Sequence, residues 1–110
     1  MTYQEIMEMA EEPGLPVAYD HFAEGEPQDP PYLVFLLPRR DDFVADGCNY
    51  FPIAELVFEL YSDRKDLGLE RRVEAVFSRR GLVFDKSEVW IGEEHLYEVL
   101  YEMEIEYEQE

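Results

Sequence analysis

The sequence predicts an α+β domain, with an antiparallel or mixed β-sheet backed by one main helix and accompanied by a short N-terminal helix. Several segments alternate apolar and polar residues, which is the period of a half-buried strand. Residues 62–81 instead have the period of an amphipathic helix, and the order along the chain is helix, strands, helix, strands. The chain has 110 residues without an internal repeat or a linker-like stretch, so we expect residues 1–110 to form a single domain.

The first third of the chain predicts one short helix and two strands. Thr2 and Glu5 have the spacing of a capping box, and a Pro-Gly pair at 13–14 ends the helical run. The segment PVAYDHF (16–22) alternates as a strand does. The segment YLVFLLP (32–38) is a short, continuous apolar run bounded by prolines, which favours a central strand over a helix.

The middle of the chain predicts a hairpin, a strand and the main helix. An Asp-Gly pair at 46–47, between FVA and CNYF, is typical of a tight hairpin turn. The segment IAELVFELYS (53–62) alternates as a half-buried strand. We expect Asp63 or Asp66 to cap the helix, and Gly81 lies just past its end. The helical spacing is followed by Leu69, Val73, Val76, Phe77 and Arg80.

The C-terminal segments predict two further strands. LVFDKSEVWIG (82–92) reads as a strand with an irregularity at residues 85–87. Residues 96–107, read as a helix, would have apolar residues on two opposite sides. Read as a strand, six apolar residues from Tyr97 to Tyr107 fall on one side, and the glutamates fall on the other together with Leu100. Such a strand would be about 40 Å long, against a radius of gyration of about 13 Å for a domain of this size. We therefore expect part of it to overhang its subunit or to meet another one.

Charge is the strongest feature of the composition. The net charge is -18, from 27 acidic and 9 basic residues, which argues against binding phosphate backbones by simple attraction. Seven of the nine basic residues lie between Arg64 and Lys86 and predict one basic patch in an acidic protein. This patterning fits either a solvated surface or a surface for a partner.

The sequence supports neither export nor membrane insertion. No apolar run approaches about 18 residues, and the first residues are acidic where a signal peptide would be basic. The single cysteine, Cys48, cannot form an internal disulfide, as is usual for intracellular or virion proteins.

Candidate residues for catalysis are few. The two histidines, His21 and His95, have acidic neighbours but lack metal-ligand spacing, and Cys48 has no evident basic neighbour that would activate a thiol. No nucleotide-binding or hydrolase motif occurs. We therefore expect a binding or assembly protein without catalytic residues, cofactor or metal.

The order of segments resembles one family of phage proteins. These are the tail terminator proteins of long non-contractile-tailed phages and prophages of Gram-positive bacteria, also called tail-to-head joining or tail completion proteins. The resemblance covers roughly residues 15–107 and depends most on ELYSDRKD, the helix with Glu70 and Glu74 after it, and the closing LYEVLYEMEI. Its other segments are VAYDHF, PPYLVFLLP and DDFVADGCNY.

The resemblance implies a structural virion protein and no enzyme. Such a protein forms a hexameric ring that stops polymerisation of the tail tube and then docks the tail onto the head connector. The implied partners are other copies of the chain, the tail tube protein and a head-completion or stopper protein, while DNA passes through without specific binding. The implied location is the tail–head interface of the virion, reached from the host cytoplasm during assembly.

Two surfaces are predicted for the ring. Each subunit of a ring presents two unlike patches, and an acidic last strand at one edge would complement a basic helix at another. The acidic candidates, for an interface or for the lumen, are Glu102, Glu104 and Glu106. The basic candidates are Arg71, Arg72, Arg79 and Arg80.

Loops are the predicted docking parts. Segment 23–31 is rich in proline and acid, and the second candidate is the hairpin around Asp46, Gly47, Cys48, Asn49 and Tyr50. Two alternatives stay open. The chain fits another neck, head-completion or minor capsid component, and its acidity also fits a DNA mimic that occupies a nucleic-acid enzyme. The glutamates of the predicted last strand also have an explanation without a partner, because charged side chains keep an exposed strand from aggregating.

Overall fold

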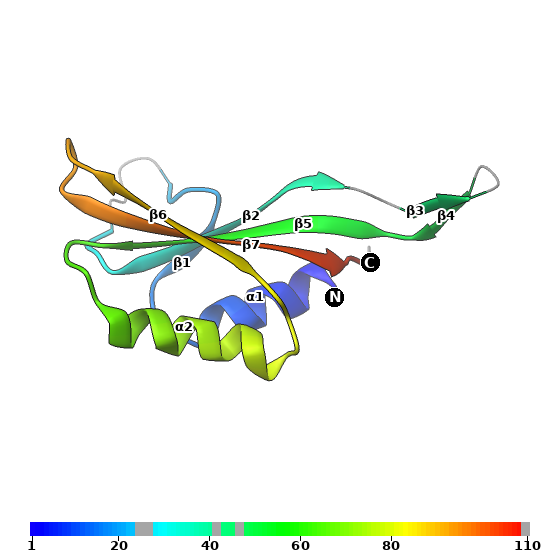
Figure 1. Cartoon of the computed structure of the whole chain (residues 1–110), viewed down its shortest axis with the longest axis horizontal. Coiled ribbons are helices and arrows are strands. Elements are labelled where there is room, and N and C mark those ends of the chain that lie inside the picture. Colours follow the sequence, from blue (N-terminus) through cyan, green and yellow to red (C-terminus); the bar gives the residue numbers. More distant parts are fainter. Residues whose placement is uncertain (24–27, 41–42, 46–47, 109–110) are drawn as a thin grey trace.

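A computed structural model shows a five-stranded mixed sheet with two helices on one of its faces (Figure 1). The structure describes residues 1–23, 28–40, 43–45 and 48–108. The elements in chain order are α1 (Tyr3–Glu11), β1 (Val17–Tyr19), β2 (Tyr32–Arg40), β3 (Phe43–Ala45), β4 (Cys48–Phe51), β5 (Ile53–Ser62), α2 (Leu67–Arg79), β6 (Asp85–Ile91) and β7 (Leu96–Glu106). The predicted α+β class is confirmed, with α2 as the main helix and α1 as the short N-terminal one.

The first helix begins at the predicted capping box. The Glu5 N–H donates to the Thr2 hydroxyl at 3.1 Å, and the Thr2 N–H donates to the Glu5 carboxylate at 3.2 Å. Two N–H groups that a helix start leaves without an intrahelical partner are thereby satisfied. Ile6, Met9 and Ala10 form the buried side of α1.

The main helix begins at Asp66, one of the two predicted caps. The Asp66 carboxylate accepts from the Leu69 N–H at 3.1 Å. The helix ends before Gly81, whose φ of +70° favours glycine, and the Leu82 N–H returns to the Phe77 carbonyl at 3.0 Å. The buried stripe is the predicted one up to Phe77, but Arg80 lies beyond the last turn, at the C-cap.

The strands of the sheet lie in the order β1-β2-β5-β7-β6. β1 and β2 are parallel, and the other neighbours are antiparallel, so the sheet is mixed. β2 lies between β1 and β5, which fits the predicted inner strand, and its register shifts between Leu36 and Arg39, around Pro38.

Aromatic side chains join the sheet to α2. Phe35, Phe58 and Tyr101 are neighbours in register on β2, β5 and β7. The Phe77 ring of α2 packs on this row, at 5.0 Å from Phe58 and 5.4 Å from Tyr101 between ring centroids. All four side chains are fully buried. Truncation of one such ring typically costs about 3–5 kcal/mol.

The strand expected over residues 82–92 is shorter and more regular than predicted. β6 begins at Asp85 and pairs with β7 without a register shift, so the irregularity expected at residues 85–87 is wrong. Phe84, the residue before β6, is not part of the sheet. The Phe84 ring lies 5.6 Å from Phe77 and 5.3 Å from Tyr101, so it is drawn into the core between the helix and the sheet.

The last segment is a strand, as predicted, but it does not overhang. β7 pairs with β5 from Tyr97, opposite Ser62, to Glu106, opposite Ile53. The expectation failed because β5 is almost as long as β7 and the molecule is elongated, with extents of 50 × 30 × 24 Å and a radius of gyration of 15.0 Å. Whether β7 contacts another subunit stays a prediction.

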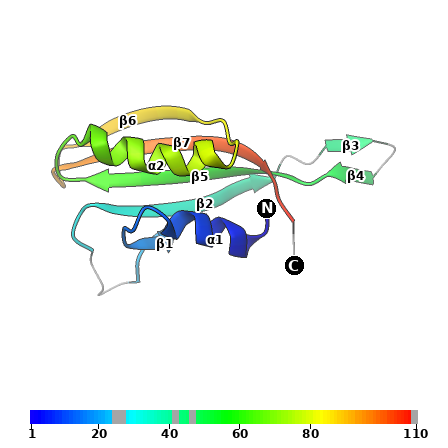
Figure 2. The same ribbon diagram turned by 90° about the horizontal axis from the view of Figure 1, so that it is seen from below.

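The predicted hairpin forms a separate two-stranded sheet. Among the described strands, β3 pairs with β4 alone, and both lie beyond the end of the five-stranded sheet (Figure 2). We call residues 43–51 the β3–β4 ribbon. Asp46 and Gly47 lie outside the described residues. None of the helices described is long and apolar enough to cross a membrane.

Candidate functional site

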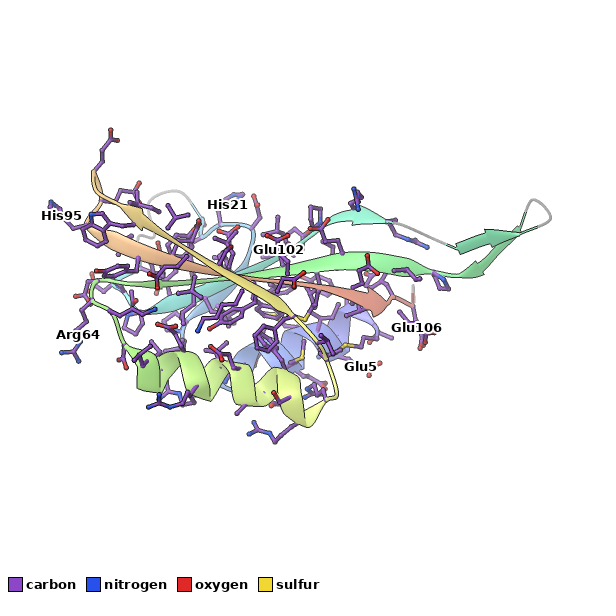
Figure 3. The ribbon with its side chains drawn as sticks, viewed as in Figure 1. Glu5, His21, Arg64, His95, Glu102 and Glu106 are labelled. Carbon is purple, nitrogen blue, oxygen red and sulfur yellow. The ribbon has the colours of Figure 1, made fainter. Side chains whose placement is uncertain are left out.

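Glu102 of the predicted acidic row lies on the open face of the sheet, which is the face away from the helices (Figure 3), and the two-residue alternation of β7 places Glu104 and Glu106 on the same side of the strand. Glu102, Glu104 and Glu106 are exposed and alternate along β7 with buried residues of the core face. Register places them on the same side as Glu55, which lies opposite Glu104 on β5. The strand therefore has one apolar and one anionic side, as predicted, while its contact with a neighbour or with DNA stays a prediction.

The acidic strand is not an edge strand, which corrects the prediction. β6 covers the outer side of β7 from Leu96 to Glu102. Beyond Glu102 the strand has β5 on one side only, until the Met1 ammonium donates to the Glu106 carbonyl at 2.5 Å. Only the last four residues of β7, which carry two of the three predicted glutamates, lie at the border of the sheet.

A groove of about 410 Å³ opens at this border. Arg39 pairs there with Glu55 at 3.8 Å, and other carboxylates surround that pair. Apolar residues complete the groove, whose lining consists of Arg39, Glu55, Val83, Phe84, Asp85, Glu102, Met103 and Glu104. Its charge is negative overall, so a cationic group fits it better than an anion.

Away from the groove, the open face of the sheet carries a pair of glutamates that share a tyrosine hydroxyl. The Tyr61 hydroxyl contacts the carboxyl oxygens of both Glu59 and Glu98. A hydroxyl has one proton to donate, so the second carboxyl satisfies the contact only by donating its own proton. Burial is the largest cause that raises the pKa of Glu59 above 4.5, and Glu98 raises it further, while the Tyr61 hydrogen bond lowers it.

Aromatic rings surround this carboxyl pair. Tyr32 stacks on Tyr61 with 5.0 Å between ring centroids, and Phe22 meets Tyr32 edge to face at 5.5 Å. Burial raises the pKa of the Tyr32 hydroxyl, and the nearby glutamates raise it further. Burial, followed by the hydrogen bonds to the two glutamates, also raises the pKa of Tyr61. Both hydroxyls therefore keep their protons near neutral pH, and Tyr61 acts as a hydrogen-bond donor to the carboxyl pair.

The predicted basic residues divide into two groups. Arg79 and Arg80 pair with Glu12 after α1, Arg79 at 3.4 Å, so they join the two helices. Arg71 and Arg72 are exposed on α2 and form no ion pair with any residue the structure describes. Only this second pair is available to a partner without breaking a contact within the chain.

A buried charge network between α2 and β6 was not predicted from the sequence. Glu70 is 3% exposed, and its carboxylate lies 2.8 Å from the ammonium groups of Lys65 and Lys86. The Glu70 Oε1 contact is an ion pair outside hydrogen-bond geometry. Lys86 also lies 2.8 Å from Glu74, which accepts from the Tyr101 hydroxyl at 2.9 Å.

This network is structural. Burial alone would raise the pKa of Glu70, but the contacts with the ammonium groups of Lys65 and Lys86 outweigh it and hold the pKa below 4.5. The signal in the sequence is that Glu70 falls within the apolar stripe, beside Leu69 and Val73. A charged residue at such a position needs a partner of opposite charge from another element.

The predicted hairpin residues are only partly described. Cys48, Asn49 and Tyr50 form most of β4, in the ribbon beyond the main sheet. Segment 23–31 has an added role, because β1 and β2 are parallel and the chain must return along the sheet between them. Residues 24–27 of that segment lie outside the description.

Neither histidine belongs to a cluster of described residues that resembles a catalytic or metal site. The His21 ring nitrogen lies 2.9 Å from the Asp20 carboxylate, and the His95 ring packs against Trp90 at the turn before β7. Among the residues that the structure describes, no group of three or more His, Cys, Asp or Glu side chains has the arrangement of a metal site. We find no arrangement on this surface that assigns a reaction.

Comparison with protein-family models finds no family that matches this chain, and comparison with curated proteins finds no match. The functional argument therefore depends on the residues and the fold.

Proposed function

We propose that this protein is a structural component of a phage virion. In this proposal it assembles into a closed ring that caps the tail tube and joins the tail to the head connector. The observation that carries the proposal is the β3–β4 ribbon. It is a two-stranded sheet that lies outside the five-stranded body, and it pairs with no other strand that the structure describes (Figure 2).

The ribbon is a poor structure in isolation. A single two-stranded hairpin is marginally stable in water, because it has no third strand or helix to cover it. Its sequence is nevertheless rich in residues that favour strands, including two phenylalanines, a valine and a tyrosine. Both facts support a role in which the ribbon is ordered against another protein, such as the tail tube or the connector.

The charge of the chain supports passage of DNA without binding. A net charge of -18 repels phosphates at long range, and the groove beside Glu102 and Glu104 has one arginine, Arg39, among its carboxylates. A ring through which a genome moves must not hold its backbone. An acidic ring meets that requirement.

The direct test is electron microscopy of the protein mixed with the tail tube protein encoded beside it. We expect a ring at one end of each tube. In a shortened variant, residues 41–53 are replaced by Asn-Gly, so that a two-residue turn joins Arg40 directly to Ala54, its neighbour in register. This variant should fold and fail to cap. Bare tube ends with the wild type, or normal capping by the shortened variant, would refute the proposal.

One observation favours a DNA mimic as the second candidate. Glu102, Glu104 and Glu106 repeat every two residues along β7, at intervals of about 7 Å, which is about twice the 3.4 Å rise between phosphates of one DNA strand. A mimic would form a 1:1 complex with a basic nucleic-acid enzyme and would not form rings. A neck or head-completion role would instead give binding to the connector without binding to tubes.

A further inference from the structure

The outer face of α2 carries cations that the chain itself does not use. Acidic residues outnumber basic ones three to one, 27 against 9. Even so, Arg71 and Arg72 on this face form no ion pair within residues 1–23, 28–40, 43–45 and 48–108, and neither does Arg64 in the loop before α2. In a protein so rich in carboxylates, arginines without an ion pair inside the chain are available to the carboxylates of a partner protein.

The shape of this face suits close contact. The buried side of α2 is centred on Leu69, Val73 and Val76, so the residues on the opposite side face solvent. Between Arg71 and Arg72, that side carries short side chains at Gly68, Ala75 and Ser78, while the exposed side chains of Leu67 and Arg79 lie toward its two ends. Short side chains between arginines let a helix lie near a flat surface while the guanidinium groups reach outward.

The open face of the sheet has the complementary character. Both helices lie on the other face (Figure 2), so no helix covers it. Apolar side chains run across its middle, where Leu36, Val57 and Leu100 lie between glutamates. A sheet face left to water usually carries mainly polar residues, so this apolar strip favours a covered face. The carboxylates on this face belong to Glu55, Glu59, Asp85, Glu98, Glu102, Glu104 and Glu106.

We propose that the outer face of α2 in one copy of the chain docks on the open sheet face of a second copy. In the contact, Arg71 and Arg72 approach the groove beside Glu102 and Glu104, and the small residues of α2 cover the apolar strip. The inference deepens the proposed function, on which its ring rests, by naming the two surfaces that meet. The contact itself is inferred from the charge complementarity of the two surfaces and from the uncovered apolar strip on the sheet.

The two surfaces lie on opposite sides of the body, so the contact is heterologous. Figure 3 shows Glu102 on the side of the sheet away from α2 and Arg64 on the α2 side. Each copy therefore uses one surface toward each of two neighbours. Repetition of such a contact gives a ring if the rotation between copies closes and a filament if it does not.

The test reverses the charge of each surface in turn. R71E/R72E makes the helix face acidic, and E102R/E104R makes the groove basic. Self-association is measured by sedimentation velocity and by mass photometry. Each variant alone should associate at least about tenfold more weakly than the wild type, because like charges meet in the contact. A 1:1 mixture should regain association, because each changed surface then meets an opposite charge on the other variant.

Matched controls separate this contact from general charge effects. E8R/E11R on α1 gives the same change in net charge as E102R/E104R, at exposed positions outside the contact. R64E adds acid near α2 without touching its outer face. Both controls should associate as the wild type does, and circular dichroism should show all variants folded.

Each outcome has a distinct meaning. A wild type that stays monomeric at millimolar concentration, or a mixture that fails to regain association, would overturn the inference. Variants that still form rings on tail tubes would overturn this contact and leave the proposed function standing. A wild type that forms dimers or larger species through these surfaces but never binds tubes would support the contact and refute the proposed function.

Discussion

Replacement of Glu70 by glutamine should destabilise the fold measurably, although it removes only a charge. Removing one partner of a buried ion pair typically costs about 3–5 kcal/mol. Here the lysine side chains are 39% and 36% exposed, so they can turn toward water and keep Glu88 and Glu74 as partners. Discounting for that screening, we expect a loss of about 1–2 kcal/mol in the free energy of unfolding.

Urea unfolding of the wild type, Glu70→Gln and Glu88→Gln measures this loss. Glu88 is the matched control, because it also pairs with Lys65 but its side chain is 37% exposed, and its replacement should cost less than about 0.5 kcal/mol. The lowered pKa of Glu70 means that its contribution is present above pH 4.5 and is lost as the pH falls through the folded-state pKa. Equal losses in the two variants, or a loss for Glu70→Gln that persists in acid, would refute the reasoning.

Three further predictions concern local features. Because the pKa of Glu59 is raised in the folded state, its contribution to stability is complete below pH 4.5 and is lost as the pH rises through the folded-state pKa. Thermal unfolding of Glu59→Gln should therefore lack the decline in stability that the wild type shows over this range. A pH profile equal to that of the wild type would contradict this. Asp66→Ala removes the α2 cap and should cost about 1 kcal/mol in urea unfolding, with no loss arguing against the cap. Gly81→Ala should cost about 1 kcal/mol through backbone strain alone, since φ is +70° and no atom lies within 4 Å of the added Cβ; a neutral result would exclude that conformation.

Local patterns predicted most of the elements. The two-residue period of residues 96–107 correctly predicted β7 against the helix preference of its glutamates, because one face of that strand is buried. The capping box at Thr2 and the glycine at position 81 marked helix ends, since both act through neighbouring backbone groups.

Features that depend on distant residues could not be predicted in this way. The overhang of β7 was wrong because only the pairing partner, β5, decides whether a long strand stays within the subunit. The burial of Glu70 depends on lysines that come from the loop before α2 and from β6. Of the candidate site, the anionic side of β7 followed from the sequence. Arg79 and Arg80 pair with Glu12, whereas Arg71 and Arg72 do not. This difference follows from the packing of the two helices, which the sequence pattern does not give.

The growth of tail tubes tests the proposed function most directly. The cognate tail tube protein is polymerised with and without this protein, at a ratio of about one six-copy ring per tube, and tube lengths are measured by electron microscopy. We predict that growth stops early and that every short tube carries a ring at one end. Tubes of the same length distribution in both reactions would contradict a terminating role.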